Sequence, residues 1–378
     1  MGKNTDLLHG YPVIDPYTGA SSIPKYQTST FNQQGIKITD HSFSYTRFGN
    51  PTISALEEGI MKLENSKYGL AFSSGMAAIS NVLMLLEAGD HVVFPIEVYG
   101  GTSQFATQIL PSYGIESSFI DMSSSECVEK AIRSNTKMIY IETPSNPLLK
   151  VTDIQEIAVL AKKKKIMTVA DNTFMTALYQ QPLELGIDVV VESMTKFING
   201  HSDVVGGLIA TNCKELYDKL YLYQKNFGGI LGVEDAWLIL RGMKTMGLRM
   251  EKSIFNAGKI AEYLTTHKKV SKVYYPGLLT HSNSRIHKKQ SSNGGAVLSF
   301  ELCDKKTLEN FINKMKIPIY AVSLGGVESI VSHPASMSHA CLSDKEREKQ
   351  GVTDNLLRLS CGIEDVDDLL KDLEQALN

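Results

Sequence analysis

A single lysine stands between two apolar runs in the stretch VVVESMTKFINGHSDVVGG, residues 189–207. Val189–Val191 end one run, the hydroxyl residues Ser193 and Thr195 follow, and Lys196 comes directly after them. A lysine amine at the end of a buried strand can react with a carbonyl group when neighbouring residues hold that group in place. The residues that follow the other apolar runs therefore indicate what Lys196 could do.

Side chains that suit one cofactor follow those other runs. Asp171 ends one run, Thr143-Pro144-Ser145-Asn146-Pro147 follows a second, and Tyr99 follows a third. Ser73-Ser74-Gly75-Met76 opens a helix, where the N–H groups of Gly75 and Met76 can hold an anion. Pyridoxal phosphate (PLP) needs a lysine for its Schiff base and a carboxylate facing its pyridinium nitrogen. It also needs donors for its phosphate and a flat group against its ring, so this combination favours PLP.

Each of these features also has a simpler explanation. A strand-end lysine is usually a surface lysine, an aspartate after a strand usually caps a helix, and Tyr99 could serve packing alone. Phosphate loops of the GxxxxGK[ST] type and the GxGxxG fingerprint after the first strand are absent from the sequence. The prediction therefore depends on the combination of features.

Alternating apolar strands and helices must position these residues. The predicted strands cover 91–95, 138–144, 166–172, 187–193, 207–211 and, later in the chain, 296–302. Predicted helices cover 53–64, 76 to about 86, a segment starting at 152, the long stretch 233–267 and 366–377. Strands that are apolar throughout imply burial on both faces, hence a mostly parallel sheet covered by helices. Ligands of such sheets gather beyond the carboxyl ends of the strands.

Length and texture predict three parts of the chain. The 378 residues exceed the usual size of one core. Residues 1–50 are rich in turn formers and predict an extended arm, 51–240 a large α/β domain, and 241–378 a linking helix with a smaller α+β domain.

Composition argues against several classes of protein. The formal net charge of −3 offers no electrostatic basis for nucleic acid or an anionic membrane as the main partner. Five scattered cysteines form no CxxC pair, which argues against a zinc site and a disulfide framework. No segment approaches the roughly 20 apolar residues of a membrane span, and the first residues lack a signal core. We expect a cytoplasmic protein.

Ordered motifs over nearly the whole chain resemble the Cys/Met-metabolism family of PLP enzymes. They include YTRFGNPT (45–52), AFSSGMAAI (71–79), VYGGT (98–102), IETPSNP (141–147), DNTF (171–174), SMTKFINGHSDVVGG (193–207), SLGGVES (323–329) and LRLSCGIED (357–365). The family includes cystathionine γ-synthase, cystathionine lyases, methionine γ-lyase and O-acetylhomoserine sulfhydrylase. The resemblance implies an aminotransferase-type fold (fold type I) and a homotetramer built from two tight dimers.

The resemblance also implies a role for each matching residue. Lys196 would hold PLP and shuttle protons, Asp171 would face the pyridine nitrogen, and Tyr99 would stack on the ring and protonate the leaving thiol. The phosphate would be held by Gly75, Met76, Ser193, Thr195 and, from the neighbouring subunit, Tyr45 and Arg47. Asn146 would reach the phenolic oxygen side of the cofactor and would also contact the substrate. The substrate carboxylate would meet Arg358, with Ser323 beside it.

Departures from the family pattern bear on the substrate. Cystathionine γ-lyases tend to have charged residues where this chain has Ser44, Gln104 and Val322, and a less charged wall suits methionine or homocysteine. Gly101 is a counter-indication, since methionine γ-lyases usually have cysteine there. Met194, Phe197 and Ala177 also depart from the pattern, at positions expected to serve packing.

The sequence therefore predicts a PLP-dependent carbon–sulfur lyase that acts by α,γ-elimination on methionine or homocysteine. The alternatives are cystathionine γ-lyase, cystathionine γ-synthase or O-acylhomoserine sulfhydrylase. A protein of this fold that only binds or scaffolds is the non-enzyme alternative.

Overall fold

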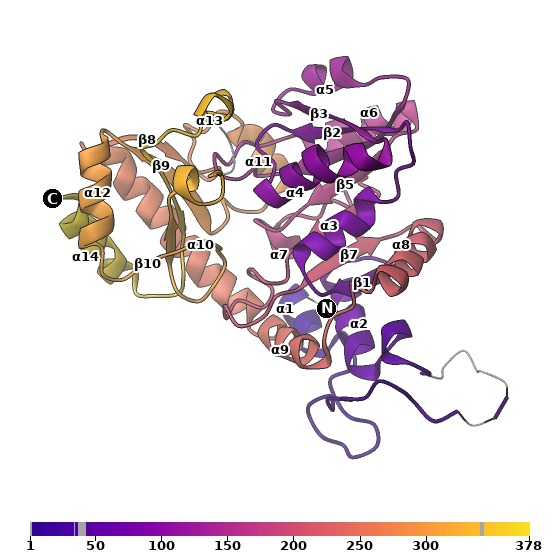
Figure 1. Cartoon of the computed structure of the whole chain (residues 1–378). Coiled ribbons are helices and arrows are strands. Elements are labelled where there is room, and N and C mark those ends of the chain that lie inside the picture. The colour runs from indigo at the N-terminus through magenta and orange to yellow at the C-terminus, as the bar shows by residue number, and fades with distance from the viewer. Residues whose placement is uncertain (1, 34, 37–42, 341–343) are drawn as a thin grey trace. The chain divides into compact units, whose positions relative to one another are not determined.

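The chain folds into two compact units. The computed structural model describes residues 2–33, 35–36, 43–340 and 344–378. Unit 1 consists of Met1–Leu85 and Asp188–Gly247, and unit 2 of Leu86–Ile187 and Leu248–Asn378. Figure 1 labels the elements of both units.

Unit 1 combines three strands with helices. Strand β7 (Gly207–Thr211) pairs antiparallel with β1 (Tyr68–Phe72) on one side and with β6 (Val189–Glu192) on the other. The helices are α1 (Lys3–His9), α2 (Pro51–Glu64), α3 (Gly75–Leu83), α8 (Lys214–Phe227) and α9 (Val233–Met243), with a 3₁₀ turn at Thr46–Phe48. Helix α2 starts where the side chain of Asn50 accepts from the N–H of Thr52, a hydrogen bond that caps its first turn.

Unit 2 contains a parallel sheet. Its strands lie in the order β5 (Met167–Asp171), β4 (Thr136–Glu142), β2 (His91–Pro95) and β3 (Glu116–Ile120), and all neighbours are parallel. Its helical segments are α4 (Gly100–Gln104), a π-helical turn (Phe105–Ile109), a 3₁₀ turn (Leu110–Tyr113), α5 (Ser125–Ala131), α6 (Ile154–Lys164) and α7 (Thr176–Tyr179). Every residue of β2 is buried, as an apolar strand of a covered parallel sheet should be.

A second, mostly antiparallel sheet also belongs to unit 2. Its order is β10 (Ile319–Tyr320), β11 (Ile330–Ser332), β12 (Leu356–Ser360), β9 (Val297–Leu302) and β8 (Val270–Tyr274). Around it lie α10 (Met246–Thr266), α11 (Ser284–Gln290), α12 (Lys305–Lys314), a 3₁₀ turn (Pro334–Ser336), α13 (Asp344–Gln350) and α14 (Val366–Leu377). Helices α12 and α14 pack against each other, and Phe300, Phe311 and Leu373 belong to the core beneath them (Figure 1).

The predicted elements agree with most of these bounds, but the long helix was predicted wrongly. The expected stretch 233–267 is interrupted at residues 244–245, between α9 and α10. There the N–H of Thr245 donates to the carbonyl of Gly242 (3.2 Å), and its hydroxyl donates to the same oxygen (3.3 Å). Such local hydrogen bonds compete with the regular helical ladder.

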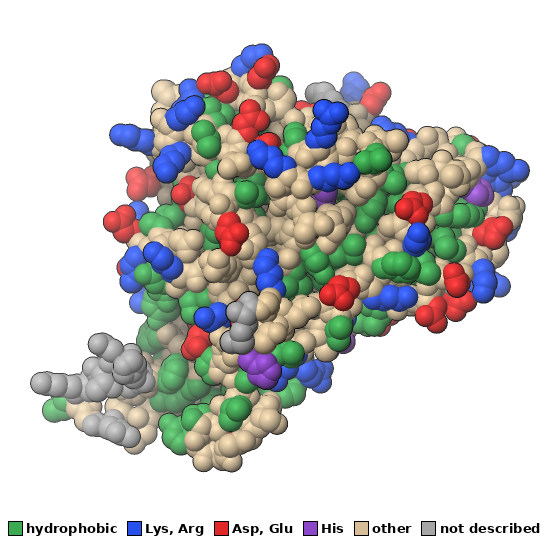
Figure 2. All heavy atoms as spheres, turned by 180° about the vertical axis from the view of Figure 1, so that it is seen from behind, with side chains coloured by type: hydrophobic (Ala, Val, Ile, Leu, Met, Phe, Trp, Pro, Cys, Tyr) green, Lys and Arg blue, Asp and Glu red, His purple; other side chains and the backbone are tan. Residues whose placement is uncertain are grey.

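Charge is mixed over the surface. On the face drawn in Figure 2, basic and acidic side chains are interspersed. Within the described ranges, no helix is both long and apolar enough to cross a lipid bilayer.

Candidate active site

Lys196 lies in a tight turn directly after β6. The N–H of Lys196 donates to the carbonyl of Ser193 (3.1 Å), and the carbonyl of Lys196 accepts from the N–H of Gly200 (2.8 Å). The hydroxyl of Thr195 accepts from the N–H of Gly206 (2.9 Å), which ties this turn to the start of β7. The lysine is therefore half-buried on a turn whose backbone is fixed at several points.

The start of α3 packs closely against that turn. A Cβ atom placed on Gly75 would lie 3.1 Å from the Cβ of Ser193, and one on Gly207 would lie 2.2 Å from the carbonyl oxygen of Ser74. Only glycine fits the approach at 207, whereas a Cβ at 75 would require Ser193 to move by a few tenths of an ångström. The side chain of Ser74 accepts from the N–H of Ala77 (2.9 Å). Among the described residues, the preceding N–H groups, those of Gly75 and Met76, have no acceptor, as is usual at a helix start.

The other predicted phosphate ligands of unit 1 lie in the segment before α2. Arg47 donates to the carbonyl oxygen of Lys225 (2.7 Å), and its guanidinium lies 4.7 Å from the ring centroid of Phe48. It also lies 5.6 Å from the ring centroid of Tyr45, whose side chain is exposed. Arg47 is thus oriented by contacts within its own unit.

In unit 2, Arg358 is a buried cation held by neutral oxygens. Its Nη1 donates to Oδ1 of Asn146 (2.8 Å), and its Nη2 donates to the carbonyl of Ser323 (2.6 Å) and to Oγ of Ser332 (3.0 Å). Its Nε has no hydrogen-bond partner among the described residues. Burial lowers the pKa of the guanidinium to about 10, while the charge of Glu142 opposes that shift. A buried cation without a direct carboxylate partner suits an anionic ligand.

Asp171 ends β5 and is oriented by two donors. Its Oδ1 accepts from the N–H of Thr173 (3.0 Å), and its Oδ2 accepts from the hydroxyl of Tyr140 (3.3 Å). Burial raises the pKa of the Asp171 carboxyl, whereas its bonds with Thr173 and Tyr140 lower it. A bound cation beside this carboxylate would favour its ionised form.

Tyr99 lies at the start of α4 and is 44% exposed, so its hydroxyl can reach a ligand. Burial and then the charges of Glu142 and Asp171 raise the pKa of its phenol. The phenol therefore keeps its proton at neutral pH. The adjacent Gly100 is close to a second loop, since a Cβ there would lie 2.7 Å from the carbonyl oxygen of Ser338.

Val322 lies next to Ser323, whose carbonyl contacts Arg358. The side chain of Val322 is 63% exposed. Ser323 has a φ of 83°, a left-handed conformation that aims its carbonyl at the guanidinium. The three departures expected to serve packing, Met194, Phe197 and Ala177, are all buried.

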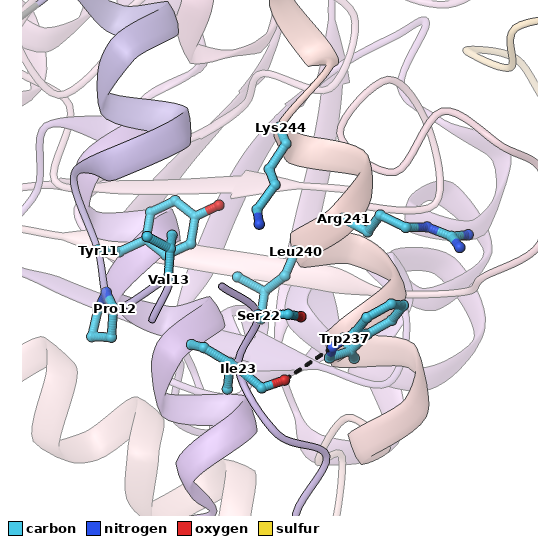
Figure 3. A pocket seen from close by; sticks show the side chains of 9 residues that line it. All are labelled: Tyr11, Pro12, Val13, Ser22, Ile23, Trp237, Leu240, Arg241 and Lys244. Carbon is cyan, nitrogen blue, oxygen red and sulfur yellow. Dashed lines mark hydrogen bonds between the residues drawn. The ribbon is translucent and has the colours of Figure 1, made fainter. Parts of the chain in front are cut away.

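A surface pocket in unit 1 is separate from these residues. It lies between residues 11–23 and α9, and Figure 3 shows Trp237, Leu240 and Lys244 among its walls. The indole Nε1 of Trp237 donates to the carbonyl of Ile23 (3.1 Å). The pocket includes none of the predicted site residues.

The two groups of residues fit PLP. Unit 1 offers N–H donors at the start of α3, where Gly75 and Gly207 allow close backbone packing, together with hydroxyls and an amine. Unit 2 offers a half-buried carboxylate, an aromatic ring and a cation whose Nε has no partner among the described residues. These are the groups that bind the phosphate, the ring, the pyridine nitrogen and an amino-acid carboxylate.

Sequence reasoning missed four contributors, namely Glu142, Tyr140, Ser332 and Gly207. Glu142 lies within the motif IETPSNP, and its strand pairs with the strand of Asp171 in the register Glu142↔Asp171. A carboxylate at the end of a buried strand was therefore a visible signal.

Comparisons with known proteins agree with this chemistry. A family model described as "Cys/Met metabolism PLP-dependent enzyme" matches residues 4–378. The chain is 50% identical to cystathionine beta-lyase MetC of Bacillus subtilis (strain 168), covering 99% of this chain and 95% of that protein. It is 49% identical to cystathionine gamma-lyase of the same organism, covering 100% and 99%. It is 44% identical to L-methionine gamma-lyase of Fusobacterium nucleatum subsp. polymorphum, covering 100% and 98%.

A solved structure extends the similarity to the fold. The crystal structure of metB from Corynebacterium glutamicum superposes with a TM-score of 0.97 at 42% identity, over 100% of this chain and 98% of that chain. The chain therefore has fold type I of the PLP-dependent enzymes, as predicted from the sequence.

Proposed function

This chain belongs to the Cys/Met metabolism family of PLP-dependent enzymes, and we propose that it is a carbon–sulfur lyase that acts on methionine or homocysteine. The α,γ-elimination consumes one water and yields 2-oxobutanoate, ammonia and the thiol. The observation that carries the proposal is Arg358, buried and held in a fork by Asn146, Ser323 and Ser332. Such a guanidinium suits the α-carboxylate of an amino acid.

The residues proposed to bind the cofactor are those that the family resemblance implies. Gly75, Met76, Ser193 and Thr195 would bind the phosphate, and Lys196 would bind PLP covalently. Asp171 would face the pyridine nitrogen, and Tyr99 would lie against the ring. When bound, PLP supplies an electron sink that stabilises negative charge on the carbon next to the substrate's amine.

Two side chains would move protons. The Nζ of Lys196 would take the proton from Cα and then one from Cβ, as an amine that binds the cofactor covalently is placed to do. The hydroxyl of Tyr99 would give a proton to the departing sulfur. Its raised pKa keeps that proton available at neutral pH.

The substrate preference is supported by uncharged residues at positions expected to face the far end of the substrate. Val322 is exposed next to Ser323, and Gln104 ends α4, which begins one residue after Tyr99. An apolar wall favours the methyl end of methionine, whereas the second amino-acid head of cystathionine would find no charged partner there.

Cystathionine is the second candidate substrate, because the two B. subtilis relatives at 49–50% identity are named cystathionine lyases. One assay separates the candidates. The holoenzyme is given methionine, homocysteine, cystathionine or cysteine, and released ammonia and 2-oxoacid are measured. A parallel reaction with O-acylhomoserine and a thiol tests γ-replacement.

Each outcome has a defined meaning. 2-Oxobutanoate from methionine or homocysteine, with higher kcat/KM than from cystathionine, supports the proposal. Pyruvate from cystathionine indicates cleavage at the β-carbon, and dominant replacement chemistry indicates a synthase. A PLP-loaded protein that turns over none of these compounds contradicts the enzyme assignment.

We also propose that Arg47 and Tyr45 complete the phosphate site of a neighbouring subunit, in a homotetramer of two dimers. Mixing Lys196→Ala and Arg47→Ala chains tests this, because only a hybrid dimer then has one site with both residues. Equal mixing should restore about a quarter of the wild-type activity if subunits exchange randomly. Absence of recovery, with exchange shown by mass, would contradict subunit sharing.

A further inference from the structure

Glu142 connects the two loops that carry Tyr99 and Asn146. It is the last residue of β4, and its side chain is buried. Its Oε2 accepts from the backbone N–H of Tyr99 (2.8 Å), and its Oε1 accepts from the backbone N–H of Asn146 (3.2 Å). One carboxylate therefore fixes the loop after β2 and the loop after β4 at the same time.

Each of these loops carries a different function of the proposed reaction. Tyr99 presents the phenol that would protonate the leaving sulfur. Asn146 accepts from Nη1 of Arg358 (2.8 Å), so its position helps to orient the guanidinium that would bind the substrate carboxylate. A displacement of Glu142 would thus move Tyr99 and Asn146 together, and with Asn146 the guanidinium of Arg358.

The hydrogen-bond geometry favours the ionised carboxylate. Both oxygens accept from N–H groups, and protonation would make one of them a hydroxyl, which accepts more weakly. Burial, the charge of Asp171 and, less strongly, the charge of Glu97 raise the pKa of Glu142 well above its ordinary value, although the two N–H groups lower it. Acidification should therefore weaken both hydrogen bonds, at a higher pH than for an exposed glutamate.

We propose that Glu142 is a positioning residue of this enzyme, whose ionised carboxylate aligns Tyr99 with the hydrogen-bonded pair Asn146 and Arg358. This inference depends on the proposed function for its catalytic consequence. The coupling of the two loops stands on the hydrogen bonds alone.

Asp372 of α14 provides a matched control. It is also buried, and its Oδ2 accepts from the backbone N–H groups of Lys316 (3.0 Å) and Ile317 (2.9 Å). It therefore holds a different segment of unit 2 and lies outside the proposed machinery.

The experiment compares Glu142→Gln and Asp372→Asn holoenzymes by hydrogen–deuterium exchange and by kinetics. We expect Glu142→Gln to speed amide exchange at least about tenfold in peptides covering 98–104 and 143–149, because both hydrogen bonds accepted by Glu142 weaken. With the best sulfur amino acid, kcat should fall and KM should rise, each about tenfold. Asp372→Asn should change both loops and both constants by less than about twofold.

Wild-type holoenzyme provides a test that does not depend on a folded variant. After correction for intrinsic exchange, both loops should lose protection over one shared pH midpoint on acidification. Separate midpoints, unchanged protection in folded Glu142→Gln, or equal losses in Asp372→Asn would overturn the inference. Absence of turnover by the wild type would reject the proposed function, while the exchange data would still decide the coupling.

Discussion

The two units hold their predicted site residues by different physical means. Around Lys196, unit 1 relies on shape, since the glycine at 207 lets the backbone approach Ser74 within a distance that a Cβ would not permit. Around Arg358, unit 2 relies on buried polar groups that satisfy one another, including Asn146 and Glu142. The first half should be sensitive to added atoms and the second to lost charge or lost acceptors.

Lys196 gives the strongest test of this comparison, because its amine would take part in the chemistry although it belongs to unit 1. We expect Lys196→Ala to fold normally and to lose turnover at least about a thousandfold, since both covalent attachment and proton transfer disappear. Lys67→Ala, an exposed lysine of the same unit, should keep full activity. Steady-state kinetics and melting curves decide it, and wild-type turnover in Lys196→Ala would remove the assignment.

Arg358 tests the dependence of unit 2 on charge. Replacement by alanine leaves Asn146 and Ser332 without their donor, and we expect KM to rise about a hundredfold, roughly 2.7 kcal/mol. Arg358→Lys should recover only part of that loss, because three donors on a single nitrogen cannot reproduce the planar fork of the guanidinium. Full recovery by lysine would show that point charge alone matters.

Gly207 tests the dependence of unit 1 on shape. The added methyl of Gly207→Ala would lie 2.2 Å from the carbonyl oxygen of Ser74, so the start of α3 must move. We expect the apparent Kd for PLP to rise roughly thirtyfold, about 2 kcal/mol. Gly258→Ala is the control, since a Cβ there meets nothing within 4 Å. Fluorescence titration of the apoenzyme measures both, and an unchanged Kd would contradict the steric account.

Val322 sharpens the comparison at the substrate's distal end. Val322→Glu adds a carboxylate that can pair with the second ammonium of cystathionine, so the ratio of kcat/KM for methionine over cystathionine should fall about tenfold, roughly 1.4 kcal/mol. Val205→Glu, at another exposed valine, should leave the ratio unchanged. A wild type that already prefers cystathionine would overturn the substrate proposal while leaving the cofactor assignment intact.

Glu64 is an exception to the rule that unit 1 relies on shape. Burial raises the pKa of its carboxyl to about 7, while its bond with Glu192 and the charge of Lys3 lower it. The folded state thus holds the proton more tightly than the unfolded chain, so stability falls as pH rises from about 4.5 to 7.

Glu64→Gln removes that penalty. At pH 8 we expect it to be more stable than the wild type by about 1–2 kcal/mol, with the gain vanishing near pH 5. Glu57, whose pKa burial also raises to about 7, titrates in the same window in both proteins and cancels in the difference. Melting curves from pH 5 to 8 test this, with exposed Glu309→Gln as control; an equal gain at pH 5 would contradict the titration.

The sequence predicted long apolar runs and clearly periodic helices, and it missed other elements, including the fully buried strand β12. Strands β2 and β7 and helix α14 match their predicted bounds, because apolar runs and helical periodicity mark them directly. Strand β3, which lies at an edge and is only partly buried, has the polar sequence ESSFI and gave no such signal.

The site divides in the same way. Lys196, Asp171 and Arg358 were predicted from motifs that are local in the chain. The two hydrogen bonds that Glu142 accepts depend on the alignment of β2 with β4, and the contact of Gly207 with Ser74 spans 133 positions of sequence. Neither follows from spacing, since each requires the register of segments that are distant along the chain.

The fork of Arg358 has a consequence for the entropy of binding. A free arginine side chain samples many rotamers, and ordering it typically costs about 1.5–2 kcal/mol. Here Asn146, Ser323 and Ser332 already select one conformation. That loss of freedom occurs when the protein folds, so a small amino acid, which makes few contacts of its own, does not have to offset it upon binding.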